Sequence, residues 1–217
     1  MKHWTHLLRA VVMLALLSWP TAAAADQAGL LPEAPPTAVV DDLHGALLEV
    51  MKEADQLGYQ GRYDRLLRVL PSFFDLPFMA QKSVGRHWKN ADEERRAQLV
   101  ETFKAFTTAN YAGNFDRYTG QTFETLGDEQ STHGTVLVRT RLVDPHGETV
   151  QLNYRVRPVD GRWKIIDIYL NGTVSELALR RSEYSSLIQR EGFDSLLVAL
   201  NEKITDLSAT TPAAKSP

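Results

Sequence analysis

Residues 150–157 read Val-Gln-Leu-Asn-Tyr-Arg-Val-Arg, and this stretch decides the fold class. Its apolar and polar side chains alternate, which predicts a β-strand with one face buried and the other turned toward solvent. Strand-like stretches flank it at residues 136–143 and 163–170, joined by turn sequences at 144–147 and 160–161. With a shorter strand at 123–126, the sequence predicts a twisted antiparallel sheet of about four strands.

The apolar period changes from 2 to 3.6 on both sides of this sheet. One helix is expected to begin at Asp41 or Asp42 and to be interrupted at Gly58, and a second covers residues 63–70. An Asp75 N-cap opens a short helix, and Asn90 is expected to cap the longest one. Two more helices follow the sheet, the first opened by a capping box at residues 173–176. Helices before and after a hairpin sheet indicate an α+β fold.

Four segments make up the expected domain organisation. Residues 1–25 have a basic start, an apolar run at 10–19 and four alanines at 22–25, which is typical of a cleaved secretory signal peptide. Residues 26–39 are proline-rich and are expected to be an extended lead-in, 40–207 a single domain, and 208–217 a flexible tail. We therefore expect an exported protein.

Composition removes several classes of function. The chain has 217 residues, a formal net charge of −3 and no cysteine. The charge argues against a nucleic-acid partner. The lack of cysteine excludes a thiol nucleophile, a disulfide scaffold, a cysteine-ligated metal and a cysteine-linked lipid anchor.

Catalytic and cofactor motifs are not found in the sequence, so we expect neither a cofactor nor a metal, and not an enzyme. His44, His87, His133 and His146 stand apart from one another, and we assign no role to any of them. Asp167 interrupts an apolar strand and is expected to be bonded to a neighbour, such as Arg155 or Arg157 across the sheet. The alternative, a periplasmic enzyme acting on a small apolar substrate, would need Asp167 or His87 as a general acid or base in a polar pocket.

Aromatic and aliphatic side chains are unusually concentrated at residues 73–88 and 111–123. They either fill a core or line a cavity for an apolar ligand. The second interpretation gains weight from a resemblance to a known family. Phe-Asp-Leu-Pro-Phe-Met-Ala at 74–80, Gly-Arg-His-Trp at 85–88 and the motifs at 154–156, 163–169 and 181–184 resemble the toluene-tolerance, or MlaC-type, periplasmic lipid-binding proteins. Asp-Ile-Tyr-Leu-Asn-Gly-Thr-Val-Ser at 167–175 is more similar to the hopanoid-biosynthesis-associated branch.

This resemblance implies a deep apolar pocket between the sheet and the helices. It implies a non-enzymatic, monomeric shuttle that carries a membrane lipid, hopanoid or phospholipid, across the periplasm and serves outer-membrane lipid asymmetry. Its partners would be an inner-membrane transporter, of the RND or the ABC/MCE type, and an outer-membrane lipoprotein. Neither the cargo nor the direction of transport follows from the sequence.

Candidates for the pocket lining come from the aromatic clusters and from the apolar faces of the strands and helices. They are Leu66, Phe73, Phe78, Val84, Trp88, Phe103, Phe106, Tyr111, Val136, Val138, Leu152, Tyr154, Ile168, Val174 and Tyr184. Val138 and Leu152 lie on neighbouring strands, and both are expected to face the lipid.

Overall fold

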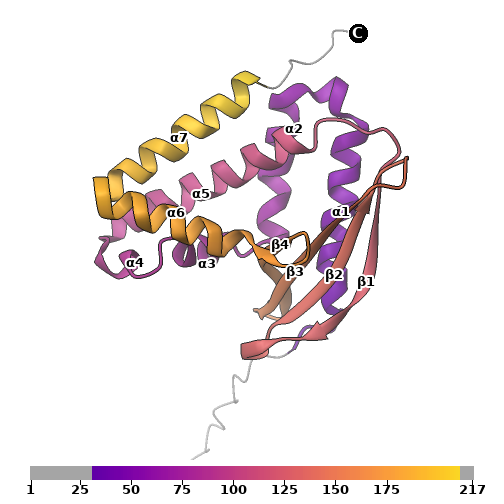
Figure 1. Ribbon diagram of the computed structural model, residues 1–217, viewed down its shortest axis with the longest axis horizontal. Helices are drawn as coiled ribbons and strands as arrows, with labels where there is room; N and C mark the ends of the chain where they lie inside the picture. The colour runs from indigo at the N-terminus through magenta and orange to yellow at the C-terminus, as the bar shows by residue number, and fades with distance from the viewer. Residues whose placement is uncertain (1–30, 211–217) are drawn as a thin grey trace, which may run out of the picture.

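A computed structural model describes residues 31–210, with five helices before the sheet and two after it (Figure 1). The helices are α1 (Pro36–Lys52), α2 (Ala54–Phe73), α3 (Leu76–Ser83), α4 (His87–Asn90), α5 (Glu93–Asn114), α6 (Glu176–Glu191) and α7 (Phe193–Thr210). The strands are β1 (Thr122–Gln130), β2 (Val136–Val143), β3 (Thr149–Val159), β4 (Arg162–Leu170) and β5 (Val174–Ser175), and a 3₁₀ turn, η1 (Thr132–Gly134), joins β1 to β2.

The strands form one antiparallel sheet in chain order, β1-β2-β3-β4-β5. The expected α+β class is therefore confirmed, with five strands in place of about four. The additional strand, β5, has only two residues and pairs with the end of β4. A two-residue strand has no room for an alternating pattern, so periodicity did not reveal it.

Cross-strand register separates the two faces of the sheet. Val138 pairs with Tyr154, which pairs with Ile168, so these three side chains share one face. Arg155 and Asp167 pair on the opposite face. The register shifts directly after this pair and leaves Ile166 as an extra residue in β4, a β-bulge.

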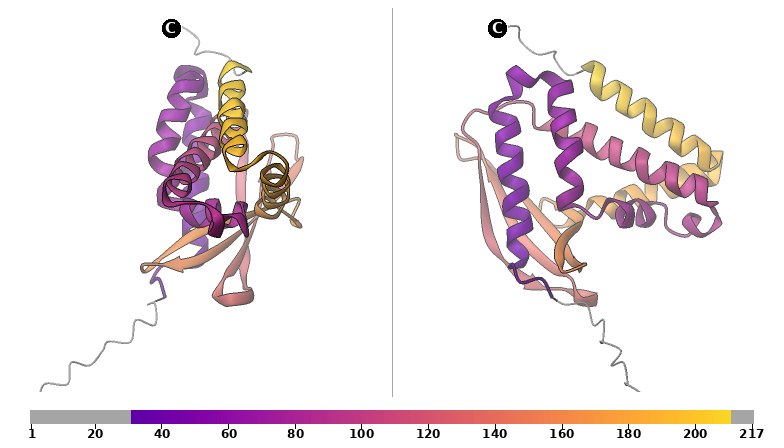
Figure 2. Two further views of the ribbon diagram at one scale, coloured as in Figure 1. Left: turned by 90° about the vertical axis from the view of Figure 1, so that its left-hand side faces the viewer. Right: turned by 180° about the vertical axis from the view of Figure 1, so that it is seen from behind.

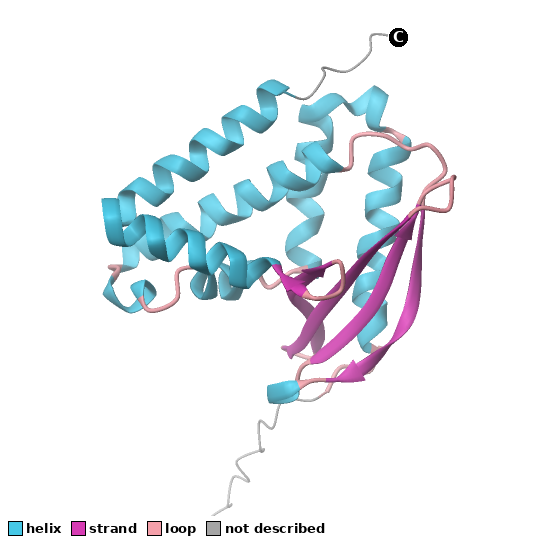
Figure 3. Ribbon diagram, viewed as in Figure 1, coloured by secondary structure: helices cyan, strands magenta, loops and turns pink. Residues whose placement is uncertain are grey.

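The helices cover the face that carries Val138 and Tyr154. Helix α1 contacts β1, β2 and β4, and α1 and α2 lie in front of the sheet when the molecule is seen from behind (Figure 2). Helices α5, α6 and α7 extend to one side, and α7 packs along α5 (Figure 3). The core between these layers includes Leu43, Phe103 and Val138, all fully buried.

Both edges of the sheet depart from a regular, fully exposed edge strand. At one edge, β1 carries a bulge between Thr125 and Gly127, and Glu124, Asp128 and Glu129 lie along the same strand. At the other edge lies β5, too short to offer more than a few free backbone groups. The sheet is thus open at both sides and does not close into a barrel.

Helix ends differ from the expected positions where several capping residues lie close together. Helix α1 begins at Pro36, so the extended lead-in ends at Pro35; a proline at the first helical position needs no hydrogen-bond acceptor. Helix α5 is capped by Asp92, whose carboxylate accepts the Arg95 N–H at 2.8 Å, and not by Asn90. Because β5 takes up Val174 and Ser175, the cap of α6 falls on Ser175, which accepts the Ala178 N–H at 3.0 Å.

The first break between helices also lies at a different residue from the one that the sequence predicted. Helix α1 ends at Lys52, five residues before the expected end, whereas Gly58 lies at φ 57° inside α2 and bends it. A left-handed φ is open to glycine at little cost, so α2 resumes after the bend. At the other end of the chain α7 reaches Thr210, so part of the expected tail is helical. The expected signal peptide at residues 1–25 lies outside the described residues.

Candidate functional site

A cavity of about 510 Å³ lies between the helix-covered face of the sheet and helices α3, α5 and α6. Its apolar lining consists of Phe74, Met79, Phe103, Tyr111, Phe115, Leu142, Val150, Leu152, Tyr154, Ile168, Leu170 and Leu177. Thr107, Asn110, Asn114, Glu176 and Arg180 supply its polar groups. The volume falls within the range of roughly 300–1,000 Å³ that is typical of small-molecule sites.

Helix α5 forms one wall through a single stripe of side chains. Phe103, Thr107, Asn110, Tyr111 and Asn114 lie at spacings of three, four and seven residues, so they project from one face of the helix. The stripe is apolar at its start and amide-bearing at its end. Polar groups lie near both ends of the stripe, however, since the Arg180 guanidinium lies over the Phe103 ring.

Aromatic rings form a continuous wall beside this stripe. Tyr111 packs edge-on against Phe74, with ring centroids 5.7 Å apart, and stacks on Phe115 at 5.4 Å. Phe115 contacts Phe123 at 6.5 Å, and Phe123 stacks on His44 at 3.9 Å. Rings that support one another in this way hold a cavity wall in place without filling the space.

The floor of the cavity contains a buried polar pair. The Nε2 atom of His44 lies 3.1 Å from the hydroxyl of Tyr154, and both residues are almost completely buried. Burial lowers the pKa of His44 from 6.5 to about 4, because desolvation disfavours the imidazolium ion. At neutral pH the ring is therefore uncharged, and its Nε2 can accept a hydrogen bond from the Tyr154 hydroxyl. Burial also raises the pKa of Tyr154, so the phenol stays protonated.

Arg180 and Glu176 form the charged part of the lining. They lie one turn apart on α6, with Arg180 Nε 2.9 Å from a Glu176 carboxylate oxygen. The Arg180 guanidinium also lies over the Phe106 ring at 5.0 Å and over the Phe103 ring at 5.7 Å. The Thr107 hydroxyl, in contrast, is buried beside the cavity without a hydrogen-bond partner.

Five of the fifteen sequence-predicted residues line this cavity: Phe103, Tyr111, Leu152, Tyr154 and Ile168. Six are buried in the core outside the lining, namely Leu66, Val84, Phe106, Val136, Val138 and Tyr184. The other four are Trp88, half-buried on α4, Val174, exposed on β5, and Phe73 and Phe78, which face other hollows. The structure thus separates Val138 from Leu152, which were expected to face the lipid together. Contact of any of these residues with a lipid remains a prediction.

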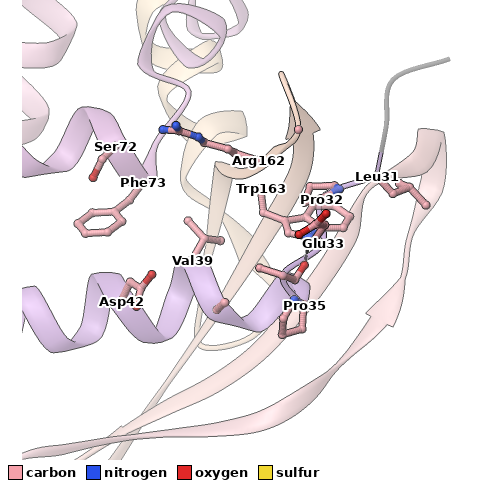
Figure 4. A pocket seen from close by; sticks show the side chains of 13 residues that line it. Leu31, Pro32, Glu33, Pro35, Val39, Asp42, Ser72, Phe73, Arg162 and Trp163 are labelled. Carbon is pink, nitrogen blue, oxygen red and sulfur yellow. Dashed lines mark hydrogen bonds between the residues drawn. The ribbon is translucent and has the colours of Figure 1, made fainter. Parts of the chain in front are cut away.

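Phe73 lies on a second, larger hollow of about 670 Å³ near the N-terminal end of α1 (Figure 4). One side of it is the lead-in at residues 31–35, and Trp163 Nε1 donates to the Ala34 carbonyl at 2.9 Å. The charged side chains of Glu33, Asp42 and Arg162 also border it. A shallow hollow with charged walls suits an acyl chain less well than the apolar cavity under the sheet.

The sequence had signals for some of the lining residues that were not selected. Phe74, Met79 and Phe115 belong to the aromatic and aliphatic clusters, and Leu142 and Val150 continue the alternation of the selected strand residues. The polar members of the α5 stripe gave no signal, because a polar residue inside an amphipathic helix usually faces solvent.

Asp167 and His87, the residues considered for an enzymatic role, lie outside this cavity. The Asp167 carboxylate accepts hydrogen bonds from the Ile168 and Leu177 N–H groups, at 2.8 and 3.1 Å, and from the Ser175 hydroxyl at 2.6 Å. The expected pairing of Asp167 with an arginine is therefore wrong, and Arg157 instead binds the Asp75 carboxylate. Asp167 links the start of α6 to β4 through these hydrogen bonds, which is a structural role.

Among residues 31–210, no helix is both long and apolar enough to cross a bilayer. No three His, Asp or Glu side chains in that range are grouped so that they could hold a metal ion.

The comparisons with known proteins agree with this architecture. The chain is similar in fold to the structure of a phospholipid-binding protein from Ralstonia solanacearum in complex with a phospholipid, with a TM-score of 0.71 at 24% identity, over 81% of this chain and 99% of that one. No curated protein sequence matches the chain significantly. The sequence model of the family described as MlaC protein matches residues 41–202, which include the whole sheet, helices α2 to α6, part of α1 and α7, and every residue of the cavity lining. The chain therefore belongs to the MlaC protein family.

Proposed function

We propose that this protein is a lipid carrier that holds the acyl chains of a membrane lipid in the cavity beneath the sheet. The observation that carries the proposal is the lining, in which twelve apolar side chains surround a space of about 510 Å³ and the charged groups lie together on α6. Such a site suits a ligand with an apolar body and a polar end.

A carrier of this kind needs no catalytic group. Removing one CH₂ group from water is favourable by about 0.8 kcal/mol. Exposing two acyl chains with roughly 30 methylenes to water would therefore cost about 25 kcal/mol of free energy. Transfer from a bilayer into an equally apolar cavity is nearly balanced in free energy, because the chains are shielded from water in both places. We propose that the protein binds its ligand without transforming it, since Glu176 and Arg180 are bonded to each other.

Phospholipid is the cargo that we propose first, because the Ralstonia solanacearum protein of similar fold binds one. Hopanoid is the second candidate, since the segment at 167–175 is similar to the hopanoid-associated branch and places Ile168 and Leu170 on the lining. In either case we propose carriage across the periplasm, after export by the N-terminal signal, between an inner-membrane transporter and the outer membrane.

The test is to purify the protein from the periplasm without detergent and to identify lipids in an organic extract by mass spectrometry. We expect phospholipid or hopanoid at a substantial fraction of one molecule per protein. The matched control is Leu179→Trp, which puts the same indole on an exposed position of α6, whereas Leu152→Trp puts it into the cavity. Loss of lipid only in Leu152→Trp supports the proposal; folded protein that is repeatedly free of lipid contradicts it.

A further inference from the structure

A cleft of about 390 Å³ lies on the face of the sheet opposite to the cavity, between α3, β3, β4 and α6. Three cationic side chains border it, each from a different element: Lys82 from α3, Arg155 from β3 and Arg181 from α6. The β-bulge at Ile166 lies at its base, beside Asp167. Bulges are frequent beside functional sites, where they change the direction of a side chain.

The three cations have no acidic partner within the described part of the chain, since none of the ion pairs there includes them. Asp167 is the carboxylate that borders the cleft, and its oxygens are occupied by the Ile168, Leu177 and Ser175 donors. The Nε of Arg155 is buried and without a hydrogen-bond partner. The cleft thus holds three cations against one carboxylate, Asp167, and its net charge is positive.

Aromatic rings hold two of these cations in place. The Arg155 guanidinium lies 5.3 Å from the centre of the Tyr169 ring, and the Lys82 ammonium 5.1 Å from that of Phe78. Both distances are those of cation–π contacts. Arginine and aromatic side chains that adjoin one another at the surface are also typical of the centre of protein–protein interfaces.

We propose that this cleft docks an acidic segment of a protein partner, with its carboxylates on the three cations and an apolar residue against Phe78 and Tyr169. The charge contrast carries the inference: the chain has a net charge of −3, yet this cleft presents three cations against a single carboxylate. A compact basic site on an acidic protein attracts a local acidic segment more selectively than an extended anionic bilayer, which would also meet the surrounding acidic residues.

The partner would be one of the membrane proteins that deliver or receive the lipid, so this part of the inference rests on the proposed function. One structural detail connects the two sites. Leu177, in the first turn of α6, borders both the lipid cavity and the cleft. A partner in the cleft would therefore contact the element that walls the lipid.

The binding test uses a fluorescein-labelled peptide of glutamate and leucine, titrated with the full protein at low and at high salt and followed by fluorescence anisotropy. We expect salt-sensitive binding that weakens at least about tenfold in Lys82→Glu/Arg181→Glu, equivalent to 1.4 kcal/mol. The control, Arg68→Glu, changes an exposed cation of α2 and is expected to change the affinity less than twofold, or about 0.4 kcal/mol. Arg155→Gln removes the central charge with little change of volume and serves if the double variant does not fold.

Three outcomes would overturn the proposal: no peptide binding, equal loss in the Arg68→Glu control, or competition by inorganic phosphate as effective as that of unlabelled peptide. Binding to phosphatidylglycerol vesicles that depends on the same cations, without peptide binding, would assign the cleft to a membrane and also overturn it. Lipid content is measured on the same samples. If the cleft variants lose the peptide and wild-type protein contains no lipid, the docking site stands and the proposed function fails.

Discussion

At the scale of single residues, His44 links the floor of the cavity to pH. Its imidazole is packed against Phe123 and bonded to Tyr154, and burial disfavours a positive charge on it. The folded-state pKa of about 4 lies below the unfolded value of 6.5, so the unfolded chain binds the proton more readily. Stability should therefore be independent of His44 above pH 6.5 and should decrease as the pH falls toward 4.

We expect the His44 contribution to reduce the free energy of unfolding by about 1.4 kcal/mol per pH unit in this window, up to about 3 kcal/mol. Urea unfolding across the window, for wild type and for His44→Gln, measures it, because glutamine can still bond to Tyr154 without titrating. Carboxylates titrate equally in both proteins, so the difference isolates His44. His146→Gln changes an exposed turn residue and should follow wild type. Parallel curves for wild type and His44→Gln would refute the assignment.

Asp167 is expected to act on stability and not on lipid exchange. Asp167→Ala removes the acceptor of three hydrogen bonds and leaves two partly buried backbone donors unpaired, which should cost about 2–4 kcal/mol. Asp167→Asn keeps an acceptor oxygen and should cost about half as much. Thermal melts measure these losses. Vesicle-to-vesicle lipid exchange, measured well below the melting temperature, should stay within about tenfold of wild type. A loss of about a thousandfold in folded Asp167→Asn would indicate catalysis.

At the scale of elements, two tryptophan substitutions on adjacent strands separate the cavity from the core. Leu152 on β3 lines the cavity, so in Leu152→Trp the indole should occupy lipid space; the delipidated variant should melt at or above wild type and bind much less lipid. Val138 on β2 is 0% exposed and lies outside the lining. In Val138→Trp we expect overpacking of about 1–3 kcal/mol, a melting temperature lower by about 2–4 °C per kcal/mol, and retained lipid.

Each substitution is the other's control, because both add an indole to the same face of the sheet. Calorimetry of the delipidated proteins and mass spectrometry of their extracts give the two measurements. If both variants melt low and keep full lipid content, the space under β3 is not the lipid site.

The elements themselves were largely predictable, whereas their ends were not. Alternation at residues 150–157 predicted β3, and the four principal strands follow from patterns and turns. The predicted helix caps were wrong where Asn90 competed with Asp92 and Thr173 with Ser175, because all four residue types are favoured at the N-cap. The choice depends on tertiary contacts, such as the pairing of β5, that local sequence does not encode.

The sequence predicted that the site is an apolar cavity, but it predicted only some of the residues that line it. Apolar excess and family resemblance both indicated a cavity, but a buried valine and a lining leucine follow the same alternation. Val138 lies in the core and Leu152 on the cavity, a difference that depends on how the helices pack against the sheet. Thr107 and Asn110 could not be identified, since only the packing of α5 in the folded protein turns this part of the helix toward the cavity.

At the scale of the whole molecule, bound lipid should stabilise the fold by mass action. A ligand at about a hundred times its Kd adds about 2.7 kcal/mol when it binds only the folded state. At about 2–4 °C per kcal/mol, protein that retains its lipid should melt about 5–10 °C above the delipidated protein. Calorimetry before and after extraction, then again after reloading from vesicles, measures this. No recovery on reloading, with refolding otherwise complete, would count against a specific site.

A sheet that remains open leaves unpaired backbone groups on its two outer strands, and these could join one copy to the next in a fibril. Here β1 places Glu124, Asp128 and Glu129 along one outer strand and interrupts its hydrogen-bonding row with a bulge, while β5 ends after two residues. If the β1 strands of two copies came together, their acidic side chains would repel one another. The bulge would also put their backbone donors and acceptors out of register. The features of these two edges thus act against polymerisation of crowded copies through their backbones.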